Sequence, residues 1–225
     1  VVSFSFVLNA VAEIYKNTDK IETLKIILPT TPNICIFEAN PEITDDWETI
    51  EAVTISGIKH WETSMNEKYP DGDWEIKIHK TIPWAEHAEK NTHEFPNCNI
   101  MFNYEDIIGD DQTIMGTTSI NFNDSRHKFM FVNVYLEQYK ITKNININFD
   151  TGEMEVTDVF ESHPMPFTVI ENIVIHEFGH SLGIGHYKIN TEIKLNEMNY
   201  DRSVMVPSIS PFEDSIILEI TDVDV

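Results

Sequence analysis

The stretch IVIHEFGHSLGIGHY, residues 173–187, joins an apolar run to three histidines, one glutamate and three glycines. His176 and His180 are four residues apart, so a helix would place both imidazole rings on one face, one turn apart. Two ring nitrogens at that separation can hold one zinc ion. The stretch is therefore either a metal site built on a helix or a crowded, inert helix end.

The residues that follow this helix favour the metal site. Gly183 can adopt the left-handed backbone conformation that ends a helix and reverses the chain. That reversal would bring His186 back as a third ligand, and three protein ligands leave the fourth zinc position open for water, as a catalytic site requires. Glu177, next to the first ligand, could reach that water and act as its general base.

The segment HEFGHSLGIGH, residues 176–186, resembles the long zinc signature of the metzincin metallopeptidases, H-E-x-x-H-x-x-G-x-x-H, at every fixed position. Metzincins also carry a tight turn with a methionine beneath the zinc, and SVMVPSI, residues 203–209, is similar to that turn. The resemblance implies that Met205 forms an apolar floor under the ligands and does not bind zinc. Met198 is the weaker candidate for this role, because its segment lacks the proline.

The methionine turn also resembles that of one branch of the family. Its Met-x-Pro form is similar to the turn of matrixins and adamalysins. By the same likeness, the side chain after the scissile bond would contact Pro207, Ser208 and Ile209. Tyr187, however, directly follows the signature, where the subfamilies carry Ser, Thr, Asp, Glu or Pro. The domain is therefore matrixin-like, and the resemblance assigns it to no subfamily.

Strand and helix patterns alternate along the rest of the chain, which predicts an α/β fold. Strands are expected at residues 34–38, 73–80, 98–105, 115–122 and 128–139, and long helices at residues 45–65 and from residue 168 onward. Asp45 or Asp46 would cap the first helix. Thr168 and Glu171 would form a capping box for the second. The metzincin resemblance implies a zincin-like domain with a twisted, mostly parallel five-stranded sheet, one antiparallel edge strand, two long helices and an irregular C-terminal subdomain.

In the matrixin-like order of elements, the antiparallel edge strand that borders the substrate cleft corresponds to IMGTTSINF, residues 114–122. An extended peptide could add to this edge as a further strand, with its backbone paired near Gly116, Thr117 and Thr118. The alternative is that Gly116 is only a turn residue at the start of the strand.

Two segments outside the signature bear on the domain organisation. We expect residues 1–30 to be an N-terminal extension and residues 31–225 to be the metzincin-like domain. VVSFSFVLNAVAE, residues 1–13, is either the remnant of a secretory signal or an ordinary first strand or helix. EITDVDV, residues 219–225, is similar to the start of the family's closing helix, so we expect the domain to stop before that helix.

The composition excludes several classes of partner. With 38 acidic and 15 basic side chains, the chain of 225 residues has a net charge of −23, which would repel nucleic acids and anionic membranes. No run approaches the roughly 18 apolar residues that a membrane span needs. We expect a monomer whose acidic surface either serves solubility or attracts basic peptides.

Cys35 and Cys98 each follow a Pro-Asn pair and lie at the start of a β-rich run. If these two strands are neighbours, a disulfide can form and would fit an oxidising compartment. Two buried free thiols are the alternative. Neither cysteine has the spacing of a zinc ligand, so we exclude both from metal chemistry.

Calcium could bind at acidic clusters, although none has the full EF-hand spacing and solvated acidic turns are the alternative. The clusters are Asp71–Asp73, Asp110–Asp111 and Asp150–Glu153. The histidines outside the signature show no paired spacing, and His127 is the candidate among them for a second metal.

These patterns and the metzincin resemblance together predict a secreted endopeptidase of peptides or proteins, in which one zinc ion on the three histidines activates water and Glu177 is the general base. One alternative is a non-catalytic, zinc-stabilised binding or adhesion domain, although a purely structural site has no need of the base. The other is a protease of narrow specificity that processes itself.

Overall fold

The computed structural model describes residues 15–17, 21–23, 32–72, 74–90, 94–106, 115–122, 128–147, 154–187 and 205. Within these residues, no helix has the length and apolar character needed to cross a membrane. The predictions that lie outside them concern residues 1–12, Asp73, Asp110–Asp111, His127, Asp150–Glu153, Met198, Pro207–Ile209 and residues 219–225.

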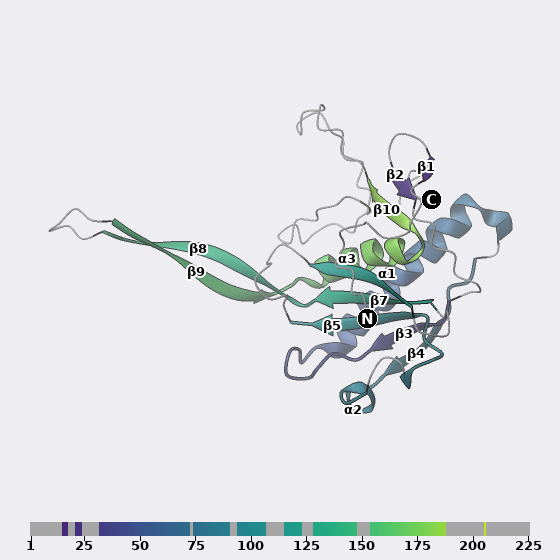
Figure 1. The fold of residues 1–225 in the computed structure, drawn as a ribbon, viewed down its shortest axis with the longest axis horizontal. Helices are drawn as coiled ribbons and strands as arrows, with labels where there is room; N and C mark the ends of the chain where they lie inside the picture. Colours follow the sequence, from purple (N-terminus) through teal and green to yellow (C-terminus); the bar gives the residue numbers. More distant parts are fainter. Residues whose placement is uncertain are drawn as a thin grey trace.

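A five-stranded sheet with the strand order β4–β3–β5–β7–β6 forms the centre of the fold (Figure 1). Four of its strands are parallel: β3 (Ile34–Phe37), β4 (Ile78–Ile82), β5 (Ile100–Glu105) and β7 (Lys128–Tyr135). The edge strand β6 (Gly116–Phe122) runs antiparallel to β7. The predicted α/β fold, its mostly parallel sheet and its antiparallel edge strand are thereby confirmed.

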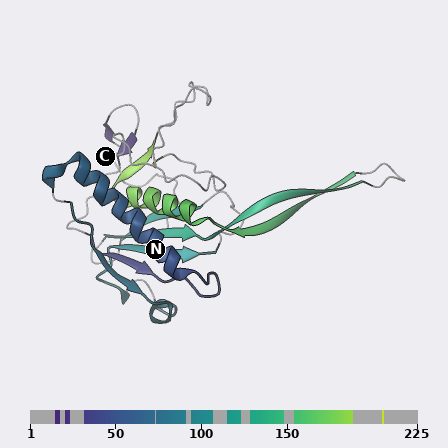
Figure 2. The ribbon, with the colours of Figure 1, turned by 180° about the vertical axis from the view of Figure 1, so that it is seen from behind.

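Two long helices, α1 (Trp47–Lys68) and α3 (Phe167–Ser181), lie side by side on one face of this sheet (Figure 2). Gly57 lets them approach closely, because a Cβ atom at this position would lie 2.9 Å from Val174 Cγ1. Trp61 Nε1 donates a hydrogen bond to the main-chain oxygen of Ile175, at 2.8 Å. Apolar packing and this bond fix α3 against α1 and thereby position its polar residues.

A second, smaller apolar cluster packs on the other face of the sheet, because successive residues of a strand face opposite sides. Its buried members are Cys35, Phe37, Ile82, Phe95, Cys98 and Met101. Cys35 and Cys98 form a disulfide with their Cα atoms 5.6 Å apart, which decides between the disulfide and the free thiols. The bond joins residues 63 apart in sequence. Closing a loop of that size lowers the conformational entropy of the unfolded chain, which raises the free energy of unfolding by about 4 kcal/mol.

Short helices η1 (Pro70–Gly72) and α2 (Trp84–His87) flank β4.

The starts of both long helices depart from the predictions in detail. α3 begins one residue early, with Pro166 as its N-cap. The predicted capping box is wrong, because Thr168 already lies in the first turn and Pro166 has no N–H for Glu171 to bind. Asp46 is the N-cap of α1, as expected, but its carboxylate accepts a hydrogen bond from the Thr49 hydroxyl at 2.6 Å and caps no backbone N–H.

A long antiparallel hairpin is not among the elements expected from the sequence. β8 (Glu137–Ile147) and β9 (Met154–Pro164) pair with each other and extend away from the sheet as an arm (Figures 1 and 2). The strand expected over residues 128–139 is in fact two strands, because β7 ends before Leu136 and β8 begins after it. Three apolar side chains of the arm are 54%, 65% and 45% exposed: Ile145, Met154 and Val156. These three side chains therefore add to the surface of the molecule and not to its core.

Part of the expected N-terminal extension pairs with the strand that follows α3. β1 (Tyr15–Asn17), β2 (Ile21–Thr23) and β10 (Ile184–Tyr187) form a three-stranded antiparallel sheet in the order β1–β2–β10. β10 contains His186. β2 therefore lies beside the strand that carries the last histidine of the signature.

Candidate metal centre

α3 ends in the way that the sequence predicts. Gly183 follows the last helical residues with a φ of 96°, in the left-handed region that glycine adopts without strain. Its N–H donates a hydrogen bond to the main-chain oxygen of His180, at 3.0 Å. β10 then begins at Ile184 and returns His186 toward the helix. The predicted reversal at Gly183 is confirmed.

The three histidines of the signature converge at this point. Nε2 of His186 lies 3.2 Å from Nε2 of His176 and 3.1 Å from Nε2 of His180. Nitrogens that bind a tetrahedral zinc ion at about 2.0–2.1 Å are roughly 3.3 Å apart, so these distances match two edges of such a site. Within the part of the chain that the structure describes, no other group of three or more metal-ligating side chains comes together. The donor set and its spacing therefore fit zinc.

One of these rings is oriented by the chain itself. His180 Nδ1 lies 2.7 Å from the main-chain oxygen of Ile184, and it carries the proton because a carbonyl oxygen only accepts. Nε2 of His180 is then left with the lone pair that a metal ligand needs. Burial, followed by the charges of His176 and His186, lowers the pKa of His180 well below its usual value. Burial and these two charges therefore favour the neutral imidazole ring, which is the form that binds metal.

Glu177, next to the first histidine, is 6% exposed. The hydroxyl of Thr118, in β6, lies 2.6 Å from Glu177 Oε2 and 2.9 Å from the Glu177 main-chain oxygen, so these two acceptors share its single proton. Burial raises the pKa of Glu177 to about 7, and the hydrogen bond from Thr118 opposes that rise. A carboxyl group held in this way can both accept and release a proton near neutral pH.

The edge strand reaches Glu177 because β6 begins with a glycine. A Cβ atom on Gly116 would lie 2.6 Å from Ile173 Cγ2 and 2.9 Å from Glu177 Cγ, so a larger residue would push β6 away from α3. Thr117 pairs with β7 in the register of the edge strand. The contact between Thr118 and Glu177 is not predicted from the sequence, because no local pattern indicates a pair 59 residues apart.

Met205 is fully buried and packs against α3. A Cβ atom on Gly179 would lie 2.6 Å from the Met205 sulfur and 2.8 Å from Trp61 Cζ2. Gly179 directly precedes His180, so the methionine lies against the helix at the level of the histidines. Its role as a floor beneath a bound metal stays a prediction.

Comparison with known proteins finds no match: no family model, no curated protein and no solved structure resembles the chain closely enough to be reported. The geometry of the chain itself shows a five-stranded mixed sheet, two long helices and a three-histidine cluster at the end of the second long helix. Such a cluster could bind a metal such as zinc.

Proposed function

We propose that this chain is a zinc-dependent endopeptidase of the metzincin type, with a matrixin-like domain. The observation that carries the proposal is the convergence of three imidazole rings beside a buried glutamate. Among the described residues, only three metal-ligating side chains come together at this site. A zinc site that only stabilised the fold would be closed by a fourth protein ligand and would have no use for Glu177.

The residues have separate roles in peptide hydrolysis. His176, His180 and His186 would hold the ion through their Nε2 atoms. A zinc ion held there would supply Lewis-acid chemistry, polarising the scissile carbonyl and lowering the pKa of a water molecule to about 7. Glu177 accepts the proton of the attacking water as the C–O bond forms, and delivers it to the amine nitrogen as the C–N bond breaks. The Thr118 hydroxyl holds the Glu177 carboxylate in place.

The edge of the sheet supports a peptide as the substrate. β6 pairs with β7 on one side, and among the described strands none pairs with its other side. Because Thr118 of β6 contacts Glu177, a peptide that added to this edge would pass close to the base. We therefore propose that the substrate backbone pairs near Gly116, Thr117 and Thr118. The metzincin resemblance implies that the side chain after the scissile bond contacts Pro207–Ile209.

The disulfide supports secretion. Disulfides persist in extracellular and other oxidising compartments and are rare where cytosolic thiols stay reduced. The Cys35–Cys98 bond lies in the apolar cluster of the sheet and joins β3 to the residues before β5. A secreted enzyme would form this bond during its export.

The direct test combines metal analysis with cleavage of a peptide library. We expect about one zinc ion per chain and loss of cleavage when a chelator removes it. Glu177→Gln, which preserves the size of the side chain, should keep zinc and lower kcat at least roughly 100-fold, as loss of a general base does. Glu89→Gln, an exposed carboxyl outside the site, is the control and should leave kcat unchanged.

Other outcomes would indicate the alternatives. Zinc-loaded protein that cleaves no member of a broad library would contradict the endopeptidase. If zinc also raised the melting temperature of that inert protein, a zinc-stabilised binding or adhesion domain would be favoured. Cleavage of the chain itself, without cleavage of library peptides, would indicate a self-processing protease.

A further inference from the structure

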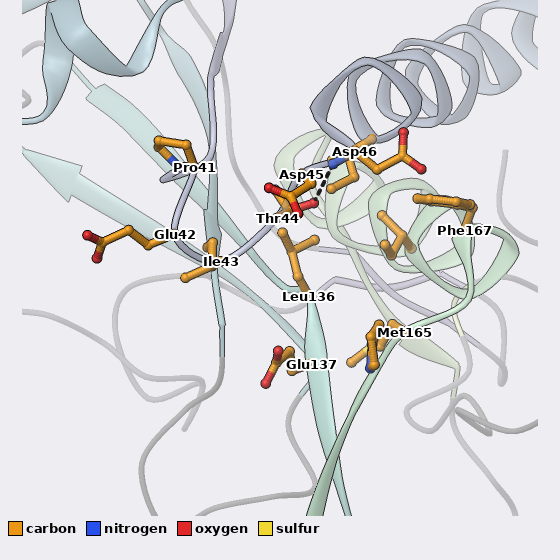
Figure 3. A pocket seen from close by; sticks show the side chains of 13 residues that line it. Pro41, Glu42, Ile43, Thr44, Asp45, Asp46, Leu136, Glu137, Met165 and Phe167 are labelled. Carbon is orange, nitrogen blue, oxygen red and sulfur yellow. Dashed lines mark hydrogen bonds between the residues drawn. The ribbon is translucent and has the colours of Figure 1, made fainter.

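A pocket of about 400 Å³ lies at the start of α3, at the opposite end of this helix from the histidines. Figure 3 shows side chains that line it. It is bounded by the segment between β3 and α1, by the first turn of α3 and by the base of the β8–β9 arm. Phe167, in that first turn, comes thirteen residues before His180, which corresponds to about 20 Å along a helix axis. The pocket is thus separate from the candidate metal centre, and its volume is typical of ligand-binding sites.

The pocket has an apolar floor and an acidic rim. The floor consists of side chains that are each at most 5% exposed: Ile50, Leu136, Met165 and Ile170. The rim carries four carboxyl side chains (Figure 3): Glu42, Asp45, Asp46 and Glu137. None of the described residues that line the pocket is a lysine or an arginine. A ligand that matches both parts has an apolar body and a positive charge.

Hydrogen bonds hold the walls of the pocket in place without a ligand. In the wall before α1, Asn40 accepts two hydrogen bonds of 2.9 Å, from the Ile43 N–H to its main-chain oxygen and from the Glu42 N–H to Oδ1. In another wall, the Met165 N–H donates to the main-chain oxygen of Leu136 at 2.8 Å. A preformed pocket loses little conformational freedom on binding, which favours affinity.

We propose that this pocket binds an arginine or lysine side chain of an extended peptide segment. The aliphatic stem of such a residue lies on the apolar floor, while its charged end stays among the carboxylates of the rim. Arginine is favoured over lysine, because its planar guanidinium can bind two carboxylate oxygens at once. The net charge of −23 disfavours anionic ligands at this site. This inference does not depend on peptidase activity, since it concerns binding alone.

Calorimetric titration with two short peptides tests the ligand class. The probe is acetylated and amidated Ala-Leu-Arg-Leu-Ala, and its control carries citrulline, which keeps the shape of arginine but not its charge. The Glu177→Gln protein is used so that cleavage does not consume the probe. We expect the arginine peptide to bind roughly tenfold more tightly, and this advantage to shrink at about 0.5 M salt, where charges are screened within a few ångströms.

A triple variant tests whether the rim is the binding site. Glu42→Gln, Asp45→Asn and Glu137→Gln together remove three rim charges, while Asp46 is kept because it is the N-cap of α1. We expect the arginine peptide to bind roughly tenfold more weakly to this variant, since partly solvated ion pairs each contribute modestly. The unfolding midpoint in urea verifies that the variant is folded.

A matched triple variant controls for the overall charge. Glu67→Gln, Glu75→Gln and Glu89→Gln remove three exposed carboxyls outside the pocket and change the net charge equally. We expect less than about a twofold loss of affinity. An equal loss in both triple variants would reveal a general attraction by the acidic surface. Equal binding of the arginine and citrulline peptides would reveal apolar contact alone, and either result overturns the proposal.

Discussion

The polar side chains at the two ends of α3 differ in their exposure to solvent. At the C-terminal end, His176, Glu177 and His180 are 7%, 6% and 2% exposed. At the N-terminal end, the rim residues Glu42 and Asp45 of the adjoining pocket are exposed to solvent. One helix thus connects a closed polar centre with an open acidic pocket.

This difference teaches which polar groups depend on a protein partner. A polar group that loses water costs free energy unless another group replaces that water. The buried end supplies such partners, since Thr118 binds Glu177 and the Ile184 oxygen binds His180. Exposed carboxylates stay hydrated, and their electrostatic interactions with other charges are weakened by water and salt. Substitutions should therefore have large, specific effects at the buried end and small, salt-sensitive effects at the open end.

The largest effect is expected for His180→Ala. Losing a residue that merely orients a ligand lowers metal affinity by roughly 10–100-fold, so losing a ligand should lower zinc affinity by more than about 100-fold. Competition with a chromophoric zinc chelator measures the change. His87→Ala is the control, because His87 also contacts a main-chain oxygen, that of Glu38 at 2.8 Å, but lies outside the cluster. Unchanged zinc affinity in His180→Ala would contradict a zinc site at the buried end of α3.

Thr118→Val tests the partner of the base. Valine keeps the shape of threonine but removes the hydroxyl, so the buried Glu177 carboxyl loses a hydrogen bond at a cost of roughly 1–3 kcal/mol. We expect kcat for peptide cleavage to fall roughly tenfold, with KM and zinc content nearly unchanged. Thr118→Ser keeps the hydroxyl and should retain most of the activity. If the serine variant loses as much as the valine variant, packing and not the hydrogen bond supports Glu177.

The buried end is also the more predictable of the two from sequence. The histidines, Glu177 and Gly183 all lie within residues 176–186, where helix geometry and one reversal fix how the side chains meet. The contact between Thr118 and Glu177 depends instead on where β6 docks against α3, which no short pattern specifies. The start of α3 shows a limit of a different kind, because Pro166 takes the N-cap position that the capping pattern assigns to Thr168.

The open end escapes prediction for physical reasons. Its pocket brings together residues near Pro41, Glu137 and Phe167, and only the tertiary fold makes these neighbours. The β8–β9 arm does carry a signal, since apolar residues alternate over much of residues 139–147 and 154–160. That pattern predicts strands that bury one face, whereas the described side chains Ile145, Met154 and Val156 are exposed. The alternation of apolar residues therefore predicts the strands of the arm but not whether they pack against the rest of the molecule.

A smaller effect is expected where α3 packs on Met205. Gly179→Ala would place a Cβ atom 2.6 Å from the Met205 sulfur. Overpacking costs about 1–3 kcal/mol, and alanine regains about 1 kcal/mol in helix propensity, so the net loss of stability should be about 1 kcal/mol. Urea unfolding of Gly179→Ala, Met205→Ala and the double variant measures it. The two effects should not fully add, because truncating Met205 removes its part of the clash and leaves only the contact with Trp61 Cζ2 at 2.8 Å. Additive effects would mean that these residues do not pack together.

The smallest effect is expected for Asp45→Asn at the open end. Its carboxylate is exposed and lies near Asp46 and Glu42, so removing its charge relieves a weak repulsion. The free energy of unfolding should rise by less than about 0.5 kcal/mol at low salt, and the gain should vanish at high salt. Urea unfolding at both salt concentrations measures this, beside Thr118→Val, whose loss should not depend on salt. A salt-independent loss above about 1 kcal/mol in Asp45→Asn would show a specific bond at the rim, and the two ends of α3 would then stabilise their polar groups in the same way.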